Sequence, residues 1–113
     1  MKISESKQGT WTVLTISGKI DHNGAEELER VLMPLASGGS IAVDFRGVEY
    51  VTSSGFRVLM HAEREQHARN GKLVLTNMRD VVRQLFDVAG LSQHFKIAQD
   101  LAAISSKPAG GPR

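Results

Sequence analysis

Residues 41–56 read Ile-Ala-Val-Asp-Phe-Arg-Gly-Val-Glu-Tyr-Val-Thr-Ser-Ser-Gly-Phe, and this stretch indicates the fold class. Its first five residues form a short, mostly apolar run, which is typical of a strand buried inside a parallel sheet. The chain then reaches the turn 52–55, where a helix is predicted to begin. The buried face of that helix is expected to comprise Phe56, Leu59, Met60 and Ala62. A buried strand that leads through a short turn into a helix favours an α/β fold.

The residues before this stretch predict two strands and one helix. Segments 3–7 and 11–17 are rich in β-branched residues and are expected to pair, with a loop at 18–22. Asn23 and Glu26 fit a capping box at the start of the helix. Pro34 lacks an amide hydrogen, so it is expected to end or kink that helix near Met33.

The residues after the stretch continue the alternation of strands and helices. Asn70-Gly71 predicts a left-handed stop for the helix after the turn. We then expect a strand at 73–75, a helix capped by Asn77 and ended by Gly90, a strand at 95–97 and a short helix at 100–104. The order ββαβαβαβα predicts one domain over 1–104, with a mixed, mostly parallel sheet flanked by about four helices. Residues 105–113, with two prolines and two glycines, are expected to form a disordered tail.

Composition argues against several classes of function. The 113 residues carry 14 Lys and Arg against 12 Asp and Glu. Such a balanced charge without a basic cluster argues against a nucleic-acid partner. The absence of cysteine excludes disulfides and thiolate chemistry. The first residues lack the apolar stretch of a signal peptide, and no segment approaches the roughly 18 apolar residues that span a bilayer. We therefore expect a cytoplasmic protein with no membrane partner.

The sequence lacks the familiar spacings of catalytic, metal-binding and phosphate-binding motifs. None of the four histidines falls in an HxH or HExxH pattern, and Gly38-Gly39-Ser40 is not followed by the Lys-Ser/Thr of a phosphate loop. Ser53-Ser54 lacks the Gly-x-Ser-x-Gly context of a nucleophile elbow. We therefore expect no catalytic residues, no metal site and no cofactor, and we do not expect an enzyme.

The turn Thr52-Ser53-Ser54-Gly55 is the predicted functional site. Plain helix capping would account for a single hydroxyl at such a position. However, the turn follows a buried strand, and ligands commonly meet open α/β sheets at the carboxyl ends of their strands. A helix N-terminus also tolerates added negative charge. A phosphate here would bring a charge of about −2 to a docking surface. The turn could thus control binding without unfolding the domain.

Five motifs resemble those of the STAS domain family, the anti-sigma factor antagonists of bacteria, and the resemblance covers about residues 8–104. Residues 44–48 and 51–56 resemble the family's strand and phosphorylated turn. Gly18-Lys19-Ile20-Asp21 resembles its Gly-x-Leu-Asp, residues 71–75 its Gly-Gly-x-Leu strand, and residues 82–91 its Val-x-x-x-Leu-x-x-x-Gly-Leu helix.

The resemblance implies a partner switch. The unphosphorylated protein would bind a kinase-like anti-sigma factor, the kinase would phosphorylate Ser53 and release it, and a metal-dependent serine phosphatase would reverse the change. Thr52 and Ser54 are alternative acceptors. The implied docking surface comprises Asp21, His22, Thr52, Ser53, Ser54, Gly55, Phe56 and Arg57.

Two positions depart from the family's pattern. Thr52 replaces the aspartate that usually precedes the phosphorylated serine, and Arg57 replaces a small residue. A cation in the first turn of a helix opposes the helix dipole. We therefore hypothesise that Arg57 contacts a partner carboxylate or the phosphate on Ser53, the alternative being a solvated side chain.

Thr52 also keeps a second function open, that of a non-phosphorylated STAS adaptor subunit of a transport ATPase or signalling complex. A small-ligand or nucleotide sensor is a third alternative. We expect a monomer or a weak dimer.

Overall fold

The computed structural model describes residues 1–36 and 38–105. Five strands form one sheet in the order β1-β2-β3-β4-β5. β1 is antiparallel to β2, and the other neighbours are parallel, so the prediction of a mixed, mostly parallel sheet is confirmed. The strands are β1 (Lys2–Gln8), β2 (Trp11–Ile20), β3 (Ser40–Val51), β4 (Lys72–Thr76) and β5 (Lys96–Ala98). The helices are α1 (His22–Leu35), α2 (Ser53–Ala68), α3 (Asp80–Val88) and α4 (Leu101–Ser105).

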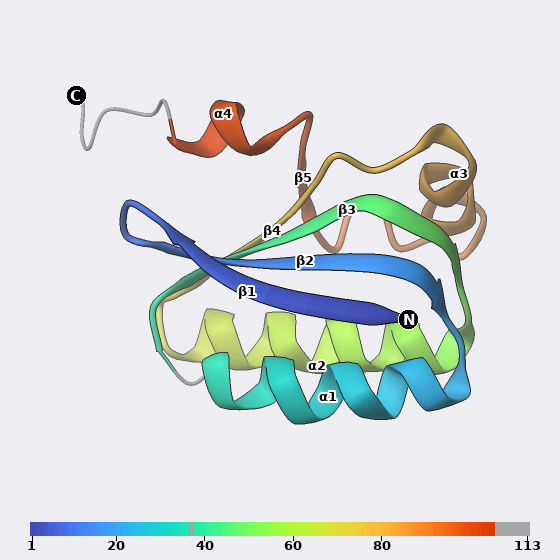
Figure 1. Cartoon of the computed structure of the whole chain (residues 1–113), viewed down its shortest axis with the longest axis horizontal. Coiled ribbons are helices and arrows are strands. Elements are labelled where there is room, and N and C mark those ends of the chain that lie inside the picture. Colours follow the sequence, from blue (N-terminus) through green and yellow to red (C-terminus); the bar gives the residue numbers. More distant parts are fainter. Residues whose placement is uncertain (37, 106–113) are drawn as a thin grey trace.

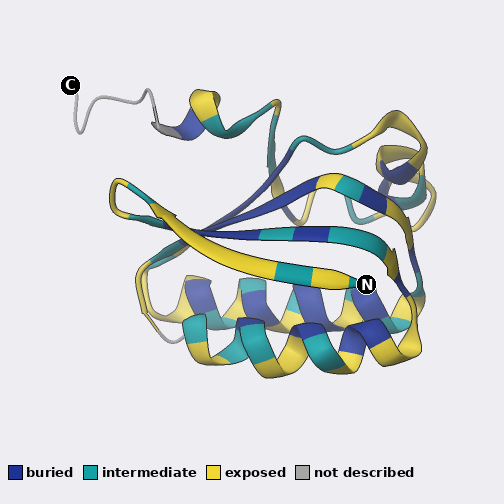
Figure 2. Ribbon diagram, in the orientation of Figure 1, coloured by how far each residue is buried: buried dark blue, intermediate teal, exposed yellow. Residues whose placement is uncertain are grey.

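Helices α1 and α2 lie side by side against one face of the sheet, whereas α4 lies on the opposite side (Figure 1). Alternate strand residues serve the two sides, because successive side chains of a strand point to opposite faces. Leu14 and Val43 belong to the main core beneath α1 and α2, while their neighbours Val13 and Ala42 belong to a smaller cluster with Ile104 of α4. Figure 2 shows the buried residues lining the inner sides of α1 and α2.

Strand β3 is longer than predicted because it stays paired with β2 through two bulges. Thr15 pairs with Asp44 and Ser17 with Gly47, and a second extra residue of β3 falls between the partners of Gly18 and Lys19. Bulges increase the bend of the strand that carries the extra residue. Pairing nevertheless resumes at the last residues of both strands, which therefore end next to each other.

Four phenylalanines join the end of the sheet to α2 and α3. The ring of Phe86 on α3 is fully buried and meets Phe45, Phe56 and Phe95 edge to face, with ring centroids 6.0, 4.9 and 5.7 Å away. Edge-to-face pairs at such distances are favourable beyond the area that they bury. Phe86 thus connects β3, the first turn of α2 and the chain that leads into β5.

Several predicted boundaries before the turn were wrong. The expected loop at 18–22 is mostly strand, because β2 continues to Ile20 and buries that side chain against the core. Asp21, not Asn23, caps α1, since it stands directly at the end of the strand. The predicted end of α1 near Met33 is confirmed to within two residues, because the helix ends at Leu35. Only Leu35 follows the proline within the helix, so little of the hydrogen-bond ladder is lost.

After the turn, the prediction of Asn77 as a helix cap was wrong. Arg79 is the cap residue of α3, and Asn77 has φ of +56° and donates its side-chain amide to Asp44. The strands at 73–75 and 95–97 are β4 and β5, with shifted ends, and the helix at 100–104 is α4. The left-handed stop at Asn70 is confirmed, with φ of +59°, and Gly90 follows α3 with φ of +74°.

Apart from Ser105, which ends α4, the predicted tail 105–113 lies outside the described residues. Within the described part of the chain, no helix is both long enough and apolar enough to cross a membrane.

Candidate functional site

The predicted site forms where β2 and β3 end side by side. Ile20 pairs with Val51 at the last position of the ladder, so Asp21 and Thr52 are neighbours although they are 31 residues apart in sequence. Each stands at the N-cap position of the following helix. The starts of α1 and α2 therefore lie together, and the structure brings Asp21 and His22 next to the turn 52–55.

Asp21 fixes the start of α1. One carboxylate oxygen, Oδ1, accepts a hydrogen bond of 2.8 Å from the backbone amide of Gly24. This is the standard N-cap arrangement, which satisfies an amide that has no partner within the helix. The Asp21 residue is exposed, so its other oxygen faces the surroundings at the site.

Thr52 connects the start of α2 to the end of β2. Its hydroxyl donates a hydrogen bond of 2.9 Å to the carbonyl oxygen of Ile20, and its backbone amide donates to the same oxygen at 3.0 Å. The Thr52 side chain makes no capping bond to α2. An ionised aspartate, which carries no proton to donate, could not make the hydroxyl contact. The replacement of the family's aspartate by threonine thus adds a bond between two elements of the site.

Replacing Thr52 with valine should lower the free energy of unfolding by about 0.5–1.5 kcal/mol, the typical net value of one hydrogen bond. Valine keeps the shape of threonine but cannot donate to Ile20. Urea denaturation monitored by circular dichroism measures the change. Thr10→Val in the exposed β1–β2 turn is the matched control and should leave stability within about 0.5 kcal/mol. Equal values for the two variants would refute a stabilising role for the Thr52 hydroxyl.

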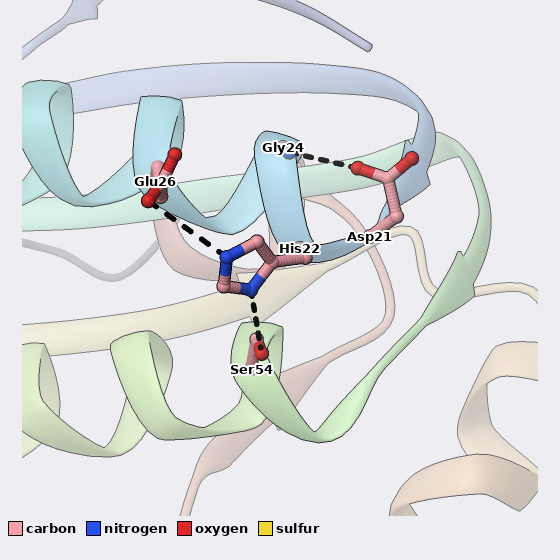
Figure 3. A network of polar contacts seen from close by, with 5 residues as sticks. All are labelled: Asp21, His22, Gly24, Glu26 and Ser54. Atoms are coloured by element: carbon pink, nitrogen blue, oxygen red, sulfur yellow. Dashed lines mark hydrogen bonds and ion pairs between the residues drawn. The ribbon is translucent and has the colours of Figure 1, made fainter.

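The two serines of the turn have different surroundings. Ser53, the first residue of α2, is exposed, and its hydroxyl forms no hydrogen bond with the described residues. Ser54 is half-buried, with its Oγ 3.5 Å from Nδ1 of His22, at the outer limit of a hydrogen bond (Figure 3). Nε2 of His22 lies 3.8 Å from a carboxylate oxygen of Glu26. Of the three hydroxyls at residues 52–54, that of Ser53 is therefore the most accessible.

A groove of about 240 Å³ lies between α1 and α2, beside this turn. His22, Glu26 and Glu29 line it from α1, and Ser54, Arg57 and His61 line it from α2. Arg57 is exposed and forms no ion pair with any described residue. The structure thus places Arg57 beside the turn with its guanidinium group available to a partner.

Gly55 and Phe56 set the position of the turn against the core. A Cβ atom at Gly55 would lie 2.7 Å from Ile20 and 2.9 Å from Val51, so any larger side chain would push α2 away from the ends of both strands. Phe56 is half-buried because its ring packs against Phe86. These two residues therefore hold the turn close to the hydrophobic core.

A polar network that the sequence did not predict lies where β4 ends beside the middle of β3. Asp44 is buried, and its Oδ1 accepts hydrogen bonds from the Arg46 amide at 2.9 Å and from the Asn77 side chain at 3.1 Å. Arg79 donates to the carbonyl oxygen of Arg46 at 2.9 Å. A charged residue inside an apolar strand, as at Asp44, is the signal that could have indicated this network.

A family model described as "Mlab, STAS domain" matches residues 3–101. The chain belongs to the STAS domain family. The anti-sigma-B factor antagonist of Bacillus subtilis is 31% identical over 99 residues, which cover 87% of this chain and 84% of that protein.

Solved structures show the same fold. The anti-sigma factor antagonist SpoIIAA in its unphosphorylated form superposes with a TM-score of 0.76 at 23% identity, covering 93% of this chain and 95% of that one. The phosphorylated form of SpoIIAA from Bacillus superposes with a TM-score of 0.70 at 21% identity, covering 93% and 98%. An anti-sigma factor antagonist from Mycobacterium paratuberculosis gives 0.82 at 20% identity, covering 93% and 91%.

Proposed function

We propose that this STAS domain is an anti-sigma factor antagonist controlled by phosphorylation of Ser53. The unphosphorylated form binds a kinase-like anti-sigma factor, and phosphate on Ser53 releases it. The observation that carries the proposal is the exposed, unbonded hydroxyl of Ser53 at the start of α2. The B. subtilis relative is named an anti-sigma-B factor antagonist, and SpoIIAA of the same fold exists in unphosphorylated and phosphorylated forms.

The geometry favours Ser53 over its two neighbours as the phosphate acceptor. The hydroxyl of Thr52 is engaged with Ile20, and that of Ser54 faces His22 in the groove. A phosphate on Ser53 would sit at the positive end of the α2 dipole, where added negative charge does not disrupt the helix. Arg57 lies four residues further along α2, a spacing at which side chains of a helix meet. Phosphorylation would thus change the charge of the surface while the fold stays intact.

The proposed docking surface comprises the exposed face of the turn and the start of α1. Asp21, His22 and Ser53 present polar groups to a partner, and Arg57 offers a cation to a partner carboxylate. In this role the chain itself performs no reaction. The kinase and a metal-dependent serine phosphatase supply the chemistry, and the domain acts in the cytoplasm as a monomer or weak dimer.

The proposal is tested by intact-mass analysis of the protein purified from its native host, with peptide mapping of residues 47–64 before and after phosphatase treatment. We expect one phosphate, on Ser53, which phosphatase removes. A phosphate on Thr52 or Ser54 would keep the switch but refute the assignment of its site.

Failure to find phosphate under several growth conditions would favour a constitutive adaptor. Thr52 favours this second candidate. It stands where the family has an aspartate beside the phosphorylated serine, and its hydroxyl bonds to Ile20 instead. A stable complex that is indifferent to ATP and kinase would support the adaptor.

A further inference from the structure

The sheet face opposite α1 and α2 carries a second hydrophobic cluster. Val13, Ala42 and Val74 pack beneath Ile104 of α4, with Trp11 at the margin. Beside this cluster, a hollow of about 280 Å³ lies between α4 and the sheet. Its apolar lining includes Trp11, Val74 and Ile104. The hollow thus has the mixture of aromatic and aliphatic surface that is common in small-ligand sites.

Two lysines flank the floor of this hollow. Lys72 lies two residues before Val74 on β4, and Lys96 is the partner of Val74 on β5. Residues paired across neighbouring strands, and residues two apart on one strand, share a face of the sheet. Lys72 and Lys96 therefore project from the same face as Val74, and both line the hollow while remaining exposed.

The charge of these lysines is not balanced within the described part of the chain. Neither forms an ion pair there. Asp100, the acid between β5 and α4, accepts a hydrogen bond of 2.9 Å from the Ala103 amide and so caps α4. The sequence after α4, residues 106–113, contains Lys107 and Arg113 and no Asp or Glu. Charge complementarity therefore favours an anion from outside the chain over the chain's own side chains.

We propose that this hollow binds a small anionic amphiphile that is free in solution, namely a carboxylate with a short alkyl tail. The carboxylate lies between the ammonium groups of Lys72 and Lys96, and the tail lies against Trp11, Val74 and Ile104. The hollow is at the amino ends of β2 and β4, whereas Ser53 follows the carboxyl end of β3. The proposal therefore does not rest on the proposed partner switch, and either can fail without the other.

Trp11 is the only tryptophan of the chain, so its fluorescence reports directly on the hollow. We expect a saturable change when octanoate is added to the full chain. Each methylene that is buried contributes about 0.8 kcal/mol, so the dissociation constant should fall about fourfold per methylene from hexanoate to decanoate. Octanol should bind more weakly and octylammonium should not bind. Amide chemical shifts of residues 72–74 and 96–104 should move with the same midpoint.

Substituting both lysines with glutamine should weaken octanoate binding by about twofold to thirtyfold, since each exposed ion pair contributes about 0.2–1 kcal/mol. Lys2→Gln, an exposed lysine on β1, is the matched control and should leave the affinity unchanged. Because these lysines are exposed, the double variant should fold, which circular dichroism checks.

Three results would overturn the proposal: no saturable change with octanoate, equal binding of octylammonium, or unchanged affinity in the double variant. An anionic acyl group could also come from a membrane lipid, and vesicles of phosphatidylglycerol test this source separately from free octanoate. A response of Trp11 to vesicles but not to free octanoate would assign the lysines to a membrane surface and would also overturn it.

Discussion

Replacing Phe86 with alanine should lower the free energy of unfolding by about 3–5 kcal/mol, the usual cost of truncating a buried phenylalanine. A domain of this size is stable by only about 5–15 kcal/mol, so a third or more of its stability would be lost. The physical reason is the position of the ring, which is fully buried and contacts Phe45, Phe56 and Phe95 edge to face. Alanine would leave a cavity among the three rings that Phe86 now contacts.

Urea denaturation at equilibrium measures this loss. If the unfolding free energy falls with urea concentration at the same slope in the wild-type protein and in Phe86→Ala, the two proteins expose a similar area on unfolding. Val88→Ala in the same helix is the matched control, because Val88 is 88% exposed and should change stability by no more than about 0.5 kcal/mol. Phe86→Leu should fall between the two. A loss below about 1 kcal/mol for Phe86→Ala would mean that the four rings do not act as a packed cluster.

The sequence predicted the order of the elements, because hydrophobic periodicity and turn residues are local signals. Residues 41–45 are apolar enough to identify a buried strand, and Asn70 adopts the left-handed conformation that its type favours. The extension of β3 to Val51 was not predictable in the same way. It depends on two bulges that keep β3 paired with β2, and pairing between distant strands leaves no signature in either segment alone.

The caps were mispredicted for a related reason. Asn23 and Asn77 are both good cap residues by type, yet Asp21 and Arg79 hold the cap positions. Tertiary contacts decide between neighbouring candidates. Ile20 stays in the strand, which places Asp21 at the first turn of α1, and the buried Asp44 recruits the Asn77 amide. Helix-cap preferences depend on the local sequence, so they cannot predict that a buried carboxylate on another strand takes Asn77 as its hydrogen-bond donor.

The sequence predicted which residues form the candidate site but not the contacts between them. The sequence placed Asp21 and residues 52–57 together only through resemblance to a family, and the structure joins them through the Ile20 carbonyl, to which Thr52 donates twice. The groove between α1 and α2 brings Glu26 and Glu29 to the site, and neither residue was among the predicted site residues. Neither feature follows from spacing within one element.

Ser53→Asp should weaken binding to the kinase-like anti-sigma factor by at least about tenfold, because the few hot-spot residues near the centre of an interface contribute about 2 kcal/mol or more, and the proposal makes Ser53 one of them. The substitution puts a carboxylate at the exposed start of α2, where it imitates part of the charge of a phosphate. It should not destabilise the domain, since negative charge is favourable at that end of a helix. Isothermal titration calorimetry with the purified anti-sigma factor measures the affinity of each variant.

The controls test whether the loss of affinity depends on where the negative charge is placed or only on adding one. Ser4→Asp adds the same charge to an exposed serine of β1 and should leave the affinity within about threefold, because screening at physiological salt confines such effects to roughly 8 Å. Ser53→Ala should bind like the unphosphorylated protein but resist release by ATP and the kinase. Arg57→Ala should also bind more weakly if its guanidinium meets a partner carboxylate. Equal losses for Ser53→Asp and Ser4→Asp would show that net charge, and not the turn, controls the partner.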